Sequence, residues 1–224
     1  MQKAITDYYS SLASEYDDNR FSNTYGKYLD YQEKLIISKY FPCNNTESVL
    51  DIACGTGRFL EFASHGIDIS EEMLKVARSK FPKKHLVCGN AKSLPFAEKS
   101  FNGVICMHLV MHLNQTELIK ILKEVKRVTQ KNGLFVFDVL SEKRRVIKKS
   151  KSKTWHCSNS ITKKNLLKII SGEWKLETYH GVAFLPIHRM PSSLRYRLLK
   201  VDNVICNSFV KEYSSYLTFV LRRI

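Results

Sequence analysis

A short apolar segment followed by two glycines is the feature that most constrains the fold of this 224-residue chain. Residues 48–53 form an apolar run that contains one acid, Asp51, and Gly55-Thr56-Gly57 follows at once. An apolar run of this length that ends in turn residues is typical of a buried strand. The apolar residues at 59, 60 and 62 have helical spacing, so the segment predicts strand, glycine turn and helix.

The same alternation continues along the chain. A helix is predicted at 28–40, and Ser70, followed by two glutamates, is a good N-cap for a second helix that ends at Phe81. Further strands are predicted at 66–69, 86–88, 103–107 and 134–140, with an amphipathic helix at 116–129. Strands that alternate with helices imply a parallel sheet covered on both faces, which is a doubly wound, Rossmann-like α/β fold.

The pattern changes after residue 140. Helices are predicted at 162–170 and 191–206, and strands at 176–184 and 216–221. The helix at 191–206 would be an insertion between the last two strands, over the edge of the sheet where ligands bind. We expect a single domain over residues 1–224, because the chain has neither internal repeats nor a low-complexity linker. Residues 181–191 are expected to face the ligand, where Arg189 could meet an acidic group or form a structural salt bridge.

The composition indicates a globular protein with excess positive charge. Hydrophobic residues make up 44% of the chain, and no stretch approaches the roughly 18 uninterrupted apolar residues of a membrane span. We therefore expect a cytoplasmic protein. The formal charge of +15 would attract anionic partners: a carboxylated or phosphorylated small molecule, RNA, or a membrane surface. Part of the excess lies at 143–153, which we interpret as a solvated loop.

The six cysteines are scattered and form no Cys-x-x-Cys pair. This pattern predicts neither a disulfide framework nor a zinc site, and no cluster of histidines suggests another metal. The glycine loop also differs from the dinucleotide fingerprint, because its third glycine position is Leu60. The loop therefore disfavours a pyrophosphate cofactor and suits a smaller adenosine ligand with a charged amino-acid tail.

These residues resemble the class I S-adenosylmethionine-dependent methyltransferases, in particular the small-molecule group. The resemblance covers about residues 8–140 and includes four motifs in the family's order. The segment from Asp51 to Gly57 looks like the first motif, whose glycines approach the methionine part of the cofactor. It implies cofactor contacts from Asp51, Ala53, Gly55 and Gly57.

The remaining motifs assign the adenosine side. Gly66-Ile67-Asp68-Ile69-Ser70 looks like the second motif, which implies that Asp68 holds the two ribose hydroxyls and that Ile69 lies beside the adenine. Residues 89–96 look like the third, with Asn90 where the family usually has aspartate, and imply contacts from Asn90 and Ala91. Asparagine can still accept a hydrogen bond through its carbonyl, but it carries no charge. Residues 100–113 look like the fourth strand and the loop after it, and imply a contact from Met107.

Residues 8–21 resemble the lid helix of this group, in which aromatic side chains close over the sulfonium end of the cofactor. Tyr16 and Arg20 are the contacts that this implies. The alternative is that Tyr9, Leu12 and Tyr16 simply pack a helix onto the domain. The resemblance implies a mostly parallel, seven-stranded sheet with an antiparallel C-terminal strand. It places lid helices in 1–45, a cofactor-binding core in 46–140 and an acceptor-side part in 141–224.

The first crossover departs from the expected spacing. Asp68 follows Gly57 by only 11 residues, whereas the acid of a glycine-loop nucleotide fold comes about 20 residues on. Either the crossover helix has about two turns and the second strand barely three residues, or Asp68 cannot reach the ribose.

The resemblance predicts methyl transfer from S-adenosylmethionine to a small-molecule acceptor. His112 is the candidate base, because an unperturbed imidazole titrates near neutral pH; a structural histidine is the alternative. Two other functions compete. The positive charge favours an RNA or protein methyltransferase, and the short crossover favours a relative that keeps the fold without the reaction.

Overall fold

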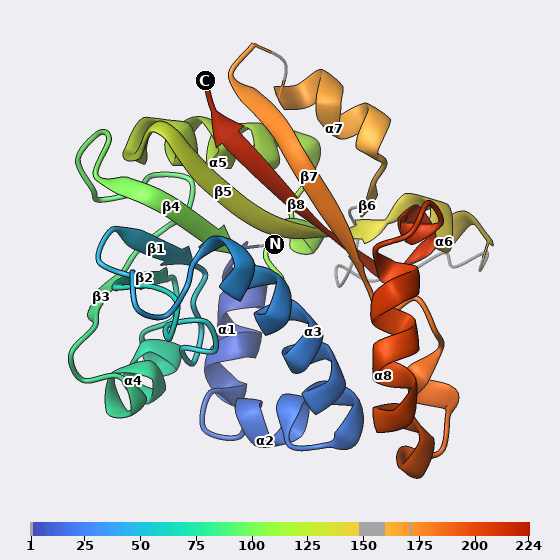
Figure 1. Cartoon of the computed structure of the whole chain (residues 1–224). Helices are drawn as coiled ribbons and strands as arrows, with labels where there is room; N and C mark the ends of the chain where they lie inside the picture. The colour runs from blue at the N-terminus through green and yellow to red at the C-terminus, as the bar shows by residue number, and fades with distance from the viewer. Residues whose placement is uncertain (1, 148–159, 171) are drawn as a thin grey trace.

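The computed structural model describes residues 2–147, 160–170 and 172–224. Within these residues the strands form one eight-stranded sheet in the order β3-β2-β1-β4-β5-β8-β7, with β6 beside β5 (Figure 1). The strands are β1 Val49–Ile52, β2 His65–Asp68, β3 His85–Cys88, β4 Phe101–Cys106, β5 Thr129–Ser141, β6 Ser160–Ile161, β7 Trp174–Val182 and β8 Tyr216–Arg223. β8 runs antiparallel to both β5 and β7, and the other neighbouring strands pair in parallel. The mostly parallel sheet and the antiparallel C-terminal strand are confirmed. The strand beyond the predicted seven is the two-residue β6.

The predicted helices form, with one exception. The helices are α1 Gln2–Leu12, α2 Tyr16–Phe21, α3 Thr24–Tyr40, α4 Glu71–Lys80, α5 Gln115–Val128, α6 Glu142–Ile147, α7 Lys163–Ile170 and α8 Ser192–Cys206, with 3-10 turns η1 Val110–His112, η2 Ile187–Arg189 and η3 Lys211–Tyr213. Ser70 caps α4 as predicted, because its Oγ accepts a hydrogen bond from the backbone N of Met73 at 3.2 Å.

Helices cover both faces of the sheet. Leu118 and Ile121 of α5 and Leu166 of α7 belong to the buried cluster on one face. Ile37 of α3 and Leu74 of α4 belong to the cluster on the other. Figure 1 shows α5 and α7 on the side of the sheet opposite α3 and α4. The doubly wound architecture is therefore confirmed.

The exception is the first crossover, where the predicted helix is wrong. Residues 53–64 form successive turns, in which Gly57 N bonds Cys54 O at 2.9 Å and Leu60 N bonds Gly57 O at 3.1 Å. The apolar side chains of the segment are still buried, together with Ile37 of α3 and Phe41, the residue that follows α3. The segment is too short for a helix because β2 uses four residues, one more than the short alternative allowed. The strand extends at the expense of the helix and ends at Asp68.

The C-terminal part adds β7, β8 and α8 to the same sheet. Helix α8 lies against lid helix α3 (Figure 1). The buried carboxylate of Asp202 joins them, because it accepts hydrogen bonds from the hydroxyl of Tyr28 at 2.7 Å, from Nε2 of Gln32 at 3.1 Å and from the backbone N of Leu185 at 2.7 Å. A buried charge with three donors is well compensated. The packing of α8 against α3 therefore supports the lid helices.

The basic run at 143–153 and the prediction about a membrane span can be compared with the described residues only. Residues 143–147 of the basic run lie in α6, where Lys143 pairs with Glu212, and residues 148–153 lie outside the described part of the chain. Among the described residues, no helix is long and apolar enough to cross a membrane.

Candidate cofactor and acceptor cavity

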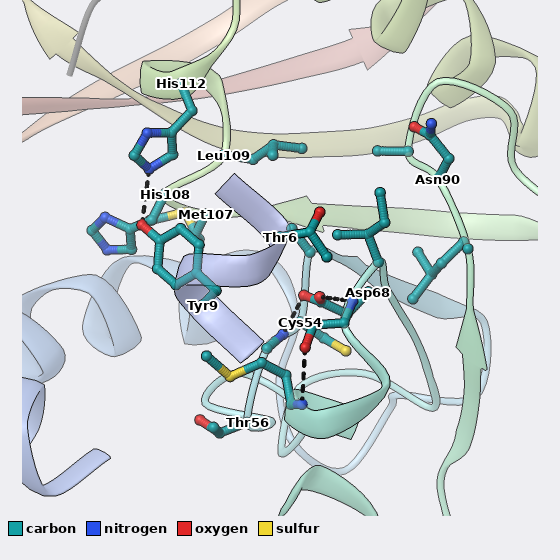
Figure 2. Close-up of a pocket in the computed structure, with 18 of the residues that line it drawn as sticks. Thr6, Tyr9, Cys54, Thr56, Asp68, Asn90, Met107, His108, Leu109 and His112 are labelled. Carbon is teal, nitrogen blue, oxygen red and sulfur yellow. Dashed lines mark hydrogen bonds between the residues drawn. The ribbon is translucent and has the colours of Figure 1, made fainter. Parts of the chain in front are cut away.

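A cavity of about 190 Å³ lies at the carboxyl ends of β1, β2 and β4, beneath lid helix α1 (Figure 2). This is the edge at which open parallel sheets bind ligands. Its lining includes nine of the residues that the sequence assigned: Tyr16, Ala53, Gly55, Asp68, Ile69, Asn90, Ala91, Met107 and His112. The described lining residues end at Ile121, so the segment 181–191 and Arg189 do not face this cavity.

Three assigned residues lie outside the lining. Arg20 of α2 is exposed; it hydrogen-bonds Tyr16, and its charge acts on Tyr9 and His108 beside the cavity. Asp51 is only 1% exposed within β1, and its burial, with the nearby Asp68 carboxylate, raises its pKa well above the usual range. Gly57 has φ of +90°, and a Cβ there would lie 3.0 Å from the side chains of Leu60 and Phe81. Gly57 therefore serves the turn and its packing, and it is not among the residues that line the cavity.

Asp68 lies at the end of the cavity beside the glycine loop, which we call the cofactor end. Its Oδ2 accepts a hydrogen bond from Gly55 N at 2.8 Å, and its Oδ1 accepts one from Ser70 N at 2.9 Å. Burial raises the pKa of this carboxyl, and the backbone hydrogen bonds offset part of that rise. The backbone N–H groups do not use all the acceptor positions of the carboxylate, so Asp68 can still receive a hydroxyl group. The short crossover therefore does not remove Asp68 from the cavity.

The glycine loop leaves space beside Asp68. Gly55 has φ of +54°, and a Cβ at this position would meet no atom within 4 Å. Ala53 at the end of β1 and His108 beyond the end of β4 also have positive φ, +56° and +60°. Such backbone is sparsely populated for residues with a side chain and clusters at ligand sites. An open cradle beside a two-oxygen acceptor fits the ribose and amino-acid parts of S-adenosylmethionine.

Asn90 lies at the other side of the cofactor end, away from His112 (Figure 2). Its Oδ1 accepts a hydrogen bond from Lys92 N at 2.9 Å, which holds the side chain in a turn. The carbonyl oxygen retains one acceptor position for an adenine amino group.

The opposite end of the cavity contains a tyrosine and histidine pair. The hydroxyl of Tyr9 in α1 lies 3.1 Å from Nε2 of His112 in η1, and Figure 2 shows this contact as a dashed line. His112 is 7% exposed, and the two rings meet edge to face. Tyr9 is therefore more than a packing residue of the lid, because it bonds the side chain that the sequence identified as the candidate base.

Two residues of the glycine loop hold the lid. The hydroxyl of Thr56 donates to Asp17 of α2 at 2.7 Å. Arg58 bonds Asp30 at 2.8 Å and Glu33 of α3, and its guanidinium lies 4.3 Å from the ring centres of both Phe21 and Phe59. The sequence analysis missed these contacts, because no local pattern pairs a loop residue with a helix some 30 residues away.

His108 forms a second polar group beside the cavity. Its backbone N donates to Asp138 Oδ1 at 2.6 Å, and its Nε2 lies 3.1 Å from Glu33 Oε2. Burial lowers the pKa of this imidazole to about 4, although the Asp138 charge acts in the opposite direction. The sequence analysis did not single out Glu33 or Asp138, which come from α3 and β5.

Residues 50–137 match the model of a family described as a methyltransferase domain. An uncharacterized protein of Methanocaldococcus jannaschii is 32% identical over 98% of this chain and 91% of its own length. A demethylmenaquinone methyltransferase of Symbiobacterium thermophilum is 29% identical over 60% of this chain and 58% of its own length. The chain thus spans somewhat more than half of that methyltransferase.

Solved structures share the architecture. An S-adenosylmethionine-dependent methyltransferase from Clostridium acetobutylicum superposes with a TM-score of 0.62 at 18% identity, over 88% of this chain and 91% of that one. At this level of identity the likeness shows the fold alone.

Proposed function

Because this chain belongs to the class I S-adenosylmethionine-dependent methyltransferases, we propose that it methylates a small molecule bound at the His112 end of the cavity. One observation carries the proposal: the Asp68 carboxylate and the Tyr9–His112 pair line the same cavity, beneath α1. S-adenosylmethionine supplies the activated methyl group when bound. The chain itself binds, orients and shields the reacting groups from water.

The shape of the site favours a small acceptor. Helix α1 contributes Thr6 and Tyr9 to the lining, so the acceptor end is covered by the chain. Covered, mostly apolar cavities suit small ligands. By its name, the relative from Symbiobacterium thermophilum acts on demethylmenaquinone, a small molecule. An RNA or protein acceptor would need this cover to open.

The charges around the cavity favour a neutral acceptor with a proton to lose. Among the described lining residues, the two cationic side chains are Arg58, paired with Asp30 and Glu33, and Lys92, paired with Glu117. The net charge of +15 therefore adds no further cation to the described lining, although Arg20, just outside it, acts electrostatically on Tyr9 and His108. Phenols and quinols meet the requirement, and His112 would receive the proton.

The proposal is tested by calorimetric titration with S-adenosylhomocysteine, followed by a screen of phenols, quinols and amines with radiolabelled S-adenosylmethionine. Saturable binding and labelled small-molecule product support the proposal. Binding without any labelled product from small molecules, but with labelled RNA or protein, would move the acceptor to the macromolecular class. An absence of binding would identify a chain that keeps the fold without the reaction.

His112→Ala is expected to lower kcat about 100-fold or more, while the Kd for S-adenosylhomocysteine stays the same, because a positioned base contributes about 10²–10⁴ to rate. Tyr9→Phe keeps the aromatic ring but removes the hydroxyl that bonds His112, so a smaller loss of kcat is expected. Steady-state kinetics with the best acceptor of the screen measure both effects. Full turnover by His112→Ala would assign this histidine a structural role.

Asn90→Asp is expected to tighten S-adenosylhomocysteine binding by roughly 3- to 10-fold, because hydrogen bonds to a charged acceptor are stronger than those to a neutral one. Asn90→Ala removes the acceptor and the bond from Lys92 N, so it should weaken binding. Calorimetry on the three proteins measures the order. Equal affinities would show that the adenine amino group does not contact residue 90.

A further inference from the structure

Three side chains from distant parts of the sequence converge beside the acceptor end of the cavity. Glu33 comes from α3, His108 from the loop after β4 and Asp138 from the carboxyl end of β5. One ligand atom from each residue lies within 4.8 Å of the other two. Glu33 and Asp138 are fully buried, whereas the imidazole of His108 is 29% exposed and lines the cavity. Figure 2 shows His108 at this end, close to the Tyr9–His112 pair.

Two buried carboxylate oxygens in this group lack a hydrogen bond. Among the described residues, neither Glu33 Oε1 nor Asp138 Oδ2 has a hydrogen-bond donor. They lie 3.0 Å from Nε2 and 3.5 Å from Nδ1 of His108, respectively. Arg58 already pairs with Glu33 through its other oxygen, Oε2, but a buried carboxylate oxygen without a hydrogen bond is still costly.

One imidazole cannot satisfy both carboxylates while it is neutral. A neutral ring carries a single N–H, and the contact with Glu33 Oε2 at 3.1 Å places that hydrogen on Nε2. Nδ1 then presents a lone pair to Asp138 Oδ2. The lone pair of Nδ1, Asp138 Oδ2 and Glu33 Oε1 are therefore atoms that a positive ion could bind.

We propose that Glu33, His108 and Asp138 bind a divalent transition-metal ion at the acceptor end of the cavity. One imidazole and two carboxylates suit ions such as Mn²⁺ and Zn²⁺. Ligand bonds of about 2.1 Å place neighbouring ligand atoms roughly 3 to 3.5 Å apart, which matches the contacts of 3.0 and 3.5 Å. Those contacts involve different ring nitrogens, so binding turns the imidazole until one nitrogen faces both oxygens.

The surroundings are those of a metal site with an open position. Arg58 bonds the other oxygen of Glu33, Oε2, and His108 N bonds the other oxygen of Asp138, Oδ1. Such outer contacts orient ligand side chains. Because three protein ligands leave at least one position free, and because His108 faces the cavity, the ion can take water or an oxygen of a bound small molecule.

The test uses the full chain freed of metal with a chelator, without methyl donor or acceptor, so it is independent of the proposed methyl transfer. Mn²⁺ is titrated by electron paramagnetic resonance and Zn²⁺ by calorimetry. The expected result is one saturable site per chain. Asp138→Asn and His108→Ala should each weaken binding at least 10-fold. The matched control is Asp30→Asn, which also alters a partner of Arg58 but lies outside the three ligands, and it should bind as the wild type does.

A second measurement covers variants that do not fold, which circular dichroism would reveal. Pulsed electron paramagnetic resonance of the Mn²⁺-loaded wild type should show hyperfine coupling to an imidazole nitrogen. Three outcomes would overturn the proposal: no saturable binding, saturable binding without nitrogen coupling, or binding that a folded Asp138→Asn variant leaves unchanged. The three side chains would then be a hydrogen-bonded network around a neutral His108, whose pKa burial lowers.

Discussion

Asp68→Ala is expected to weaken S-adenosylhomocysteine binding by about 100-fold or more. In its proposed role the carboxylate accepts both ribose hydroxyls, and each hydrogen bond to a charged group contributes about 1.5–3 kcal/mol. Loss of two such bonds exceeds the roughly 2.8 kcal/mol that corresponds to a 100-fold change. The substitution also leaves Gly55 N without its acceptor, so the loop that faces the ligand loses its anchor. Calorimetric titration measures the change in Kd.

Glu71→Gln is the matched control for Asp68→Ala. Glu71 lies three residues further on, in the first turn of α4, where its half-exposed carboxylate pairs with Arg78. Exposed pairs of this kind contribute about 0–1 kcal/mol, so the ligand affinity should stay the same. An Asp68→Ala protein that binds as tightly as this control would show that the ribose is held elsewhere.

Arg58→Ala is expected to lower the free energy of unfolding by about 3–5 kcal/mol, because it leaves a fully buried partner, Glu33, without its cation. The substitution also removes a guanidinium that lies between Phe21 and Phe59. For a chain of this size each kcal/mol corresponds to roughly 2–4 °C, so the Tm should fall by about 6–20 °C. Thermal unfolding followed by circular dichroism measures it.

Lys34→Ala is the control for Arg58→Ala, because it removes a cation from a partly exposed ion pair instead of a buried one. Lys34 pairs with Asp30 and Glu61 on the outer side of α3, where all three side chains are partly exposed. Its removal should cost about 0–1 kcal/mol. If the Tm of Arg58→Ala falls no further than that of Lys34→Ala, the Arg58 pair behaves as a surface pair despite its burial.

Local patterns predicted most of the fold, because each strand and helix has its signal within a few residues. Ser70 and the two glutamates after it identified the start of α4, and the apolar spacing of 116–129 identified α5. The first crossover was wrong for a physical reason: helical spacing of three apolar side chains is also satisfied by successive turns that bury the same side chains. The small number of residues between β1 and β2 allows only turns, and the apolar spacing does not distinguish turns from a helix.

The candidate site divides in the same way. The cofactor end could be predicted because Gly55 and Asp68 belong to motifs that follow consecutive strands. At the acceptor end the sequence singled out His112 but not its contact with Tyr9, because the two residues are 103 positions apart and meet only when α1 lies over the sheet. Glu33, His108 and Asp138 come from three separate elements, and nothing local in the sequence connects them.

The turns of the first crossover affect how the lid can move away from the cavity. Residues 53–64 lack the backbone ladder of a helix and are held on one side by α3, through Arg58, Ile37 and Phe41. We therefore expect the lid and the glycine loop to behave as one cooperative unit in native-state hydrogen exchange. Displacement of α3 would then loosen the cradle for the methyl donor, and under the proposed function it would couple entry of the acceptor to release of the spent donor.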